Sequence, residues 1–144
     1  EYNVRFGDPE CQVLMMRLED DLLDLMLATA KGELAGRAAP TFSSETALTV
    51  VMAAKGYPGT PETGGAIAGI DAAEANGARV FQAGTAEADG KLVANGGRVL
   101  NVTALGGSVA EAQRHAYAAV ERVDFPTGFC RSDIGWREIE REQA

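Results

Sequence analysis

The sequence predicts an α+β protein, with helices near its start, an antiparallel sheet in its middle and one helix covering that sheet. Early apolar residues recur at the spacing of three and four that is typical of a buried helix face. Further on, short β-branched runs alternate with Asn-Gly and Asp-Gly pairs, as in hairpins. With 144 residues, of which 46% are hydrophobic, the chain is long and apolar enough for a packed core.

The opening stretch EYNVRFGDPE alternates polar and apolar side chains, as a strand with one face in the core does. Glu1, Asn3 and Arg5 form the polar face, and Tyr2, Val4 and Phe6 form the apolar face. Carboxylate and amide oxygens suit Mg²⁺, and a neighbouring guanidinium suits the phosphate oxygens that Mg²⁺ shares. An ordinary strand with a solvated polar face explains the pattern equally well, so periodicity alone leaves both interpretations open.

Helices follow this stretch. Asp8 is placed to cap the first helix, with Pro9 at the first helical position. Asp20-Asp21 marks a break that can cap a second helix, and Gly32 ends the pattern. Residues 32 to 46 then mix Gly, Ala, Pro and Ser without a period, which indicates a loop and a domain boundary. Because the chain lacks a starting Met and begins inside a patterned strand, we expect it to be a piece of a longer protein.

The middle of the chain predicts the sheet. Strand-like runs occupy residues 46–54, 65–70, 79–85, 91–94 and 98–106. Three turn pairs, Asn76-Gly77, Asp89-Gly90 and Asn95-Gly96, separate them and favour tight hairpins because both residues tolerate positive φ. We therefore expect the strands containing Val50, Val80 and Val102 to belong to one antiparallel sheet that curls toward a barrel.

Ser108 begins the covering helix. Glu111 completes a capping box with it. The apolar stripe of this helix consists of Val109, Ala112, Ala116, Val120 and Val123. The only histidine, His115, falls off this stripe, which favours an exposed flank position over catalysis. Because no Ser/His/Asp or Cys/His arrangement can be built around this one histidine, hydrolysis by nucleophilic catalysis is disfavoured.

Composition excludes several classes of protein. The net charge of −8, from 21 acidic and 13 basic residues, argues against a nucleic-acid surface. Cys11 and Cys130 have no metal-binding spacing and are interpreted as free thiols in a reducing compartment. No apolar run approaches the roughly 20 residues of a membrane span, and no signal-like segment starts the chain. We expect a cytoplasmic protein that binds neither nucleic acid nor membranes.

Two short segments are candidates for anion binding. KGYPG places Lys55 at the end of a buried strand beside flexible glycine backbone, where it can reach a phosphate or carboxylate. NGGRV places Gly96 and Gly97 before Arg98, where backbone amides and a guanidinium can share one anion. The alternatives are a solvated hairpin end for Lys55 and a tight turn with an exposed arginine for Arg98. Local sequence leaves these alternatives open.

Five segments, in order, carry a family resemblance: EYNVRFGDPE, VVMAAKGYPG, GGRVLNVTALG, AEAQRHAY and FCRSDIGWREIE. They resemble the C-terminal third of glycinamide ribonucleotide synthetase, also called phosphoribosylamine-glycine ligase, and the resemblance covers essentially the whole chain. Gln82 departs from the family pattern, because many relatives have His there, in FHAGT.

The resemblance implies a division into two parts. Residues 1–35 would be the last strand and helix of an ATP-grasp domain, and residues 36–144 a small barrel-like antiparallel domain with a covering helix. It also implies site residues: Glu1 and Asn3 as Mg²⁺ or Mn²⁺ ligands, Arg5 as a catalytic stabiliser of a phosphate or acyl phosphate, and Lys55, Tyr57, Gly97 and Arg98 as substrate contacts.

The implied reaction is ATP-dependent carbon–nitrogen ligation in purine biosynthesis. Glycine would be phosphorylated by ATP, and the amine of 5-phosphoribosylamine would attack the glycyl phosphate. Phosphoryl transfer depends on positioning and metal neutralisation, which agrees with the lack of a catalytic histidine. The chain would act together with the upstream N-terminal and ATP-grasp domains and would be inactive alone. A non-catalytic, stand-alone binding module that keeps the ligase's C-terminal fold is the alternative.

The assignment of Glu1 as a metal ligand predicts the effect of Glu1→Gln in the full-length ligase. The fold should persist, while turnover should fall more than about tenfold because the metal loses its charged ligand. Steady-state assays at ordinary Mg²⁺ concentration measure this. Wild-type turnover in the variant would remove Glu1 from the site.

Overall fold

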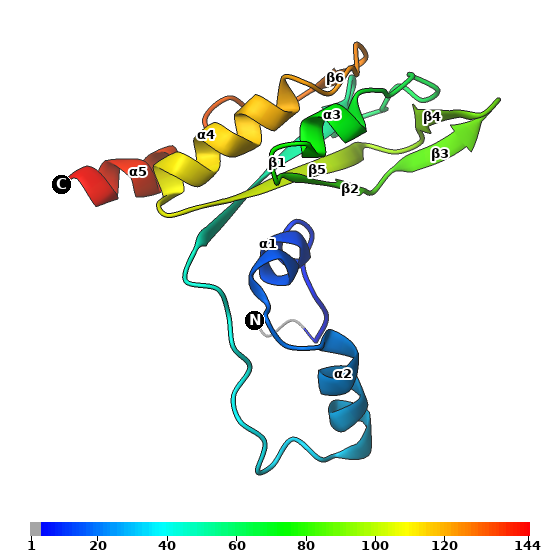
Figure 1. Ribbon diagram of the computed structural model, residues 1–144. Coiled ribbons are helices and arrows are strands. Elements are labelled where there is room, and N and C mark those ends of the chain that lie inside the picture. The colour runs from blue at the N-terminus through cyan, green and yellow to red at the C-terminus, as the bar shows by residue number, and fades with distance from the viewer. Residues whose placement is uncertain (1–3) are drawn as a thin grey trace.

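The structure is a computed structural model that describes residues 4–144. The elements, shown in Figure 1, run in the order α1 (Glu10–Arg17), α2 (Leu22–Lys31), β1 (Thr46–Ala54), α3 (Ile70–Glu74), β2 (Arg79–Gln82), β3 (Thr85–Ala88), β4 (Lys91–Ala94), β5 (Arg98–Gly106), α4 (Val109–Val120), β6 (Gly128–Phe129) and α5 (Trp136–Gln143). The mixture of helices with antiparallel strands confirms the α+β class.

The long strands β1 and β5 form the centre of the protein. They pair antiparallel from Thr46 opposite Gly106 to Met52 opposite Leu100. In the middle of this pair Val50 lies opposite Val102, and on the other side of β5 Val80 lies opposite Val102 as well. The sheet order is β2-β5-β1-β6. The prediction that the Val50, Val80 and Val102 strands share one antiparallel sheet is confirmed.

Helices lie on both faces of this sheet. Figure 1 shows α4 over one face and α1 against the other, and both helices contact β1 and β5. The buried residues of α4 are Ala112, Ala116 and Ala119, whose small side chains let the helix approach closely. The Ser108 hydroxyl caps α4 by accepting a hydrogen bond from the Glu111 backbone N–H at 3.2 Å. The predicted covering helix and its cap are therefore confirmed.

The predicted opening strand is wrong for the residues that the structure describes. Val4 and Arg5 form a bend, and the side chains expected in the core are exposed, at 100% for Val4 and 52% for Phe6. A strand needs a neighbouring strand for its backbone hydrogen bonds, and none pairs with residues 4–6 within the described part. Glu1 and Asn3 lie outside the described residues.

The start of α1 differs from the prediction, whereas both ends of α2 agree with it. The N-cap residue of α1 is Pro9 rather than Asp8, and no side chain caps that helix. Asp21 does cap α2, accepting hydrogen bonds from the backbone N–H groups of Leu23 and Asp24. Gly32, with a φ of 71°, ends α2 in the left-handed region, as predicted.

The predicted hairpin pattern holds at one of three turns. Asp89 and Gly90 both have positive φ, 51° and 70°, and connect β3 to β4 as a tight hairpin. Asn76-Gly77 instead follows α3, because residues 65–70 make only isolated bridges before the chain turns into that helix. Asn95-Gly96 connects β4 to β5, and these strands belong to different sheets.

The expected curl toward a barrel is also absent from the described part of the chain. The four-stranded sheet ends at β2 and β6, and β3 and β4 form a separate two-stranded sheet. Barrel closure needs a continuous ladder around the axis, in proteins typically of about eight strands, and the β3-β4 hairpin leaves the main sheet instead.

A β-bulge interrupts the central pair near the start of β5. Met52 pairs with Leu100 but Ala53 pairs with Arg98, so Val99 is the extra residue. Val99 and Leu100 are consecutive, and both are fully buried. Beyond a bulge the alternation of faces is inverted, so Arg98 lies on the same face as Asn101 rather than on the face of Leu100.

Within residues 4–144, none of the helices has the length and apolar character that crossing a membrane requires.

The pairing of β1 with β5 predicts which apolar side chains stabilise the fold. Leu100→Ala should lower the free energy of unfolding of the chain by about 2–5 kcal/mol, because Leu100 is 0% exposed and its truncation leaves a cavity. Leu23→Ala, at a position that is 74% exposed, should change stability by less than about 0.5 kcal/mol. Urea unfolding of both variants measures the difference, and equal effects would contradict this view of the core.

Candidate functional site

A cavity of about 460 Å³ lies on the α1 side of the sheet. Thr49, Val51 and Ala53 of β1 form its floor. Its walls come from four segments: Pro9 before α1, Tyr57 and Pro58 after β1, Arg98 of β5, and Phe129, Cys130, Arg131 and Ile134 around and after β6. Its lining is largely apolar, and its charged groups are the two guanidiniums, an arrangement that suits binding of an anion beside an apolar group.

The structure brings three of the four predicted substrate contacts together here. Tyr57 and Arg98 line the cavity, and Gly97 lies directly under the tyrosine ring, so a Cβ at position 97 would meet Tyr57 Cδ2 and lie 3.0 Å from Cε2. The Gly97 carbonyl accepts a hydrogen bond from the Ala54 N–H at 2.9 Å, which fixes this corner to the end of β1. Lys55 is exposed and does not line the cavity.

Arg98 is held by Asp8, a residue that sequence reasoning assigned to capping. Arg98 Nη2 lies 3.2 Å from Asp8 Oδ2, and Arg98 Nη1 donates to the Asp8 backbone carbonyl at 3.2 Å. Asp8 Oδ1 accepts from Gln12 Nε2 at 3.0 Å and from Asn101 Nδ2 at 3.4 Å. These contacts join the segment before α1 to β5, about ninety positions further along the sequence. The only sequence signal at Asp8 was its place in a Gly-Asp-Pro turn, which does not indicate a contact with Arg98.

Arg131 forms the second ion pair of the cavity. Its guanidinium donates two hydrogen bonds of 2.8 Å to the Asp133 carboxylate. The Arg131 hydrogen bond lowers the pKa of Asp133, so this carboxylate keeps its charge to lower pH than a free aspartate does. Helix α4 holds the same segment, because the Tyr117 hydroxyl donates to the Arg131 carbonyl at 2.6 Å and Gln113 Nε2 donates to the Ile134 carbonyl at 2.7 Å.

The described side chains of the cavity are better suited to binding than to acid–base chemistry. Burial raises the pKa of the Cys130 thiol, which keeps it protonated and a weak nucleophile. His115 lies elsewhere, on α4, and its Nδ1 is 2.8 Å from the Leu105 carbonyl oxygen. Its side chain is 40% exposed, as the sequence predicted for a flank position.

Arg5, the predicted catalytic residue, is not part of this cavity. Arg5 is exposed, donates to the neighbouring Phe6 carbonyl at 3.1 Å and does not line the cavity. Glu1 and Asn3 are not described. Across residues 4–144, no group of three or more His, Cys, Asp or Glu side chains is placed to hold a metal ion.

A family model described as "Phosphoribosylglycinamide synthetase, C domain" matches residues 47–137, which include all but the first residue of β1, all of β5 and α4, and most of the cavity wall. The chain belongs to this family.

Similar proteins include several called phosphoribosylamine–glycine ligase. The chain is 62% identical to one from Mesorhizobium japonicum over 144 residues, covering 100% of the chain and 34% of that protein. It is 53% identical to a chloroplastic one from Arabidopsis thaliana, covering 99% of the chain and 27% of that protein. The crystal structure of the Thermotoga maritima ligase matches with a TM-score of 0.78 and 40% identity, covering 93% of the chain and 32% of the ligase. The chain thus spans about a third of the relatives it matches.

The close contact of Gly97 with Tyr57 predicts the effect of Gly97→Ala. The added methyl should displace the tyrosine ring. This overpacking should lower the free energy of unfolding by about 1–3 kcal/mol. The ring resonances of Tyr57 in NMR spectra measure the displacement. Gly107→Ala is the control, since its Cβ would meet only the Glu111 carboxylate, at 3.3 Å. Unchanged Tyr57 resonances in Gly97→Ala would contradict the contact.

Proposed function

We propose that this chain is the C-terminal part of a phosphoribosylamine–glycine ligase. The whole enzyme would use ATP to phosphorylate glycine and would join the resulting glycyl phosphate to 5-phosphoribosylamine. The observation that carries the proposal is the 62% identity to a protein of that name along all 144 residues of the chain. The family match over residues 47–137 supports it independently of the N-terminal segment.

The division into two parts belongs to this proposal. Residues 1–35 would complete the ATP-grasp domain, and residues 36–144 would form the C-terminal domain. Their contact supports a site near the boundary between them, because α1 packs against β1 and β5, and Pro9, just before α1, lines the same cavity as Arg98.

Glu1 and Asn3 would hold Mg²⁺ or Mn²⁺, and Arg5 would contact the phosphate beside it. A carboxylate and an amide supply hard oxygen donors of the kind these ions take, with the remaining ligands coming from water and phosphate. When bound, the metal would neutralise charge on the phosphate being transferred. The guanidinium of Arg5 is exposed, and its only hydrogen bond within the described residues is to Phe6, so its remaining donors can meet a phosphate oxygen.

The cavity would receive the non-nucleotide substrates. Arg98 and Arg131 supply positive charge for the phosphate of 5-phosphoribosylamine or the carboxylate of glycine, since guanidinium groups match both. Tyr57 and Phe129 would cover the apolar side of the bound sugar. Closure of this largely apolar cavity by the rest of the enzyme would exclude water and protect a reactive glycyl phosphate from hydrolysis. Lys55 is kept as a candidate contact outside the cavity.

The proposal predicts different behaviour for the chain alone and for the ligase that contains it. The 144-residue chain should show no glycine-dependent ATP consumption and should bind ATP·Mg²⁺ no tighter than about millimolar, because Mg²⁺ held by one or two protein oxygens depends on a further protein cradle for the nucleotide phosphates. The ligase should release ADP only with both glycine and 5-phosphoribosylamine.

Isothermal titration of ATP·Mg²⁺ and a coupled ADP-release assay test both statements. Micromolar binding or substrate-dependent turnover by the chain alone would overturn the placement of the nucleotide site. A ligase without glycine-dependent ADP release would overturn the proposed function and favour a non-catalytic binding module.

A further inference from the structure

We propose that Asp8 is a positioning residue, which holds the Arg98 guanidinium in one orientation at the wall of the cavity. The inference rests on the proposed function for its kinetic consequence, but the orientation itself can be tested without activity. Asp8 does not line the cavity and would act on substrate only through Arg98.

The contact geometry carries the proposal. Arg98 uses two different nitrogens on two different oxygens of Asp8, Nη2 on the carboxylate and Nη1 on the backbone carbonyl, each at 3.2 Å. Two such contacts fix the plane of a guanidinium, which a single contact does not. The hydrogen bond to the backbone carbonyl occupies one of the five N–H donors of Arg98, and Nη2 faces the carboxylate as an ion pair, so further donors remain for a substrate anion.

Asp8 is itself fixed from two sides. Gln12 of α1 donates to its carboxylate at 3.0 Å, and Asn101 of β5 donates at 3.4 Å. Asn101 is 0% exposed, so its amide is immobilised within the sheet. Asp8 therefore connects the position of α1 to the orientation of Arg98.

The β-bulge at Val99 makes this arrangement possible. Arg98 and Asn101 are three residues apart on β5 and would lie on opposite faces of a regular strand. Because Val99 is the extra residue, both side chains reach Asp8 on the same face. Bulges commonly re-aim a side chain beside a functional site.

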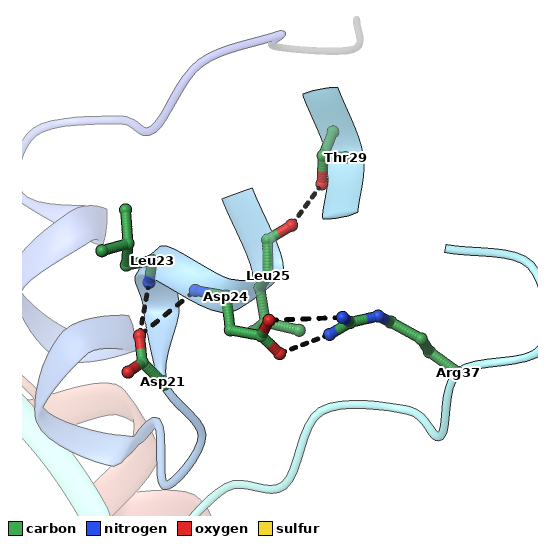
Figure 2. A network of polar contacts seen from close by, with 6 residues as sticks. All are labelled: Asp21, Leu23, Asp24, Leu25, Thr29 and Arg37. Atoms are coloured by element: carbon green, nitrogen blue, oxygen red, sulfur yellow. Dashed lines mark hydrogen bonds and ion pairs between the residues drawn. The ribbon is translucent and has the colours of Figure 1, made fainter. Parts of the chain in front are cut away.

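Stability alone does not explain the pair. The Arg98 and Asp8 side chains are 42% and 37% exposed, and exposed ion pairs contribute little to folding. Arg37 and Asp24 form a pair with similar exposure, 37% and 58%, in the α2 region (Figure 2). Neither residue lines the cavity. This second pair is the matched control for the tests below.

Kinetics of the full-length ligase test the role. Asp8→Asn should lower kcat about tenfold while KM for 5-phosphoribosylamine and glycine changes less than about threefold, since a misplaced guanidinium costs more in the transition state than in binding. In an Arg98→Met background, or Arg98→Lys if that variant does not fold, Asp8→Asn should change kcat less than about twofold. Asp24→Asn should leave all constants unchanged.

Two kinetic results would overturn the proposal. One is an Asp8→Asn enzyme with wild-type kcat. The other is an Asp8→Asn effect of the same size with and without Arg98, since that would show that Asp8 acts by another route. A thermal melt of each variant separates loss of activity from loss of folded protein.

A second measurement does not depend on turnover. Phenylglyoxal modifies accessible arginines, and mass spectrometry of peptides from the ligase gives the rate at each site. Asp8→Asn should raise the rate at Arg98 severalfold and leave Arg37 unchanged, whereas Asp24→Asn should do the reverse. Unchanged modification of Arg98 in Asp8→Asn would overturn the proposal. An inactive wild-type ligase in which Asp8→Asn raises the Arg98 rate would instead overturn the proposed function and leave the positioning role standing.

Discussion

The antiparallel pairing of β1 with β5 is the constraint on which the other parts of this structure depend. Both strands have nine residues, and their register sets which side chains face α4 and which face α1. A shift by one residue would exchange the two sets. The α1 face also carries a polar contact, since the Thr103 hydroxyl donates to the Thr49 hydroxyl at 2.8 Å, and a hydroxyl pair of this kind is satisfied in only one register.

The bulge at Val99 changes that register locally, and the change places Arg98 at the cavity. Regular alternation would have sent Arg98 toward the apolar face that α4 covers, where a charged group is costly without a partner. The inverted alternation instead places it beside Asp8 and the cavity. The direction of the Arg98 side chain thus depends on one extra residue in β5 and on the packing of α1 against the sheet.

Local sequence signals predicted the parts of the fold that local forces determine. The runs 46–54 and 98–106, the Asp89-Gly90 hairpin and the Ser108 cap were all readable from neighbouring residues. The opening strand was not, because a strand exists only with a pairing partner, and Val4 has none among the described residues. Nor could local sequence reveal the contacts of Asp8, since its partners on β5 are about ninety positions away. Gly97 and Arg98, which lie at the cavity, carried a local signal, since a glycine-rich turn precedes a basic residue. Tyr57 was expected there from the family resemblance, and Arg131 carried no signal of either kind.

The charges of the cavity show how an acidic protein can accommodate an anion. With a net charge of −8, the protein as a whole repels anions, and salt screens charges more than about 10 Å away. Attraction must therefore come from the guanidiniums at the cavity itself. Each is paired with a carboxylate, Arg98 with Asp8 and Arg131 with Asp133, which reduces the local positive charge but fixes the direction of the remaining N–H donors. Such an arrangement favours geometry over strength of attraction, which suits the substrate-binding role proposed for the cavity.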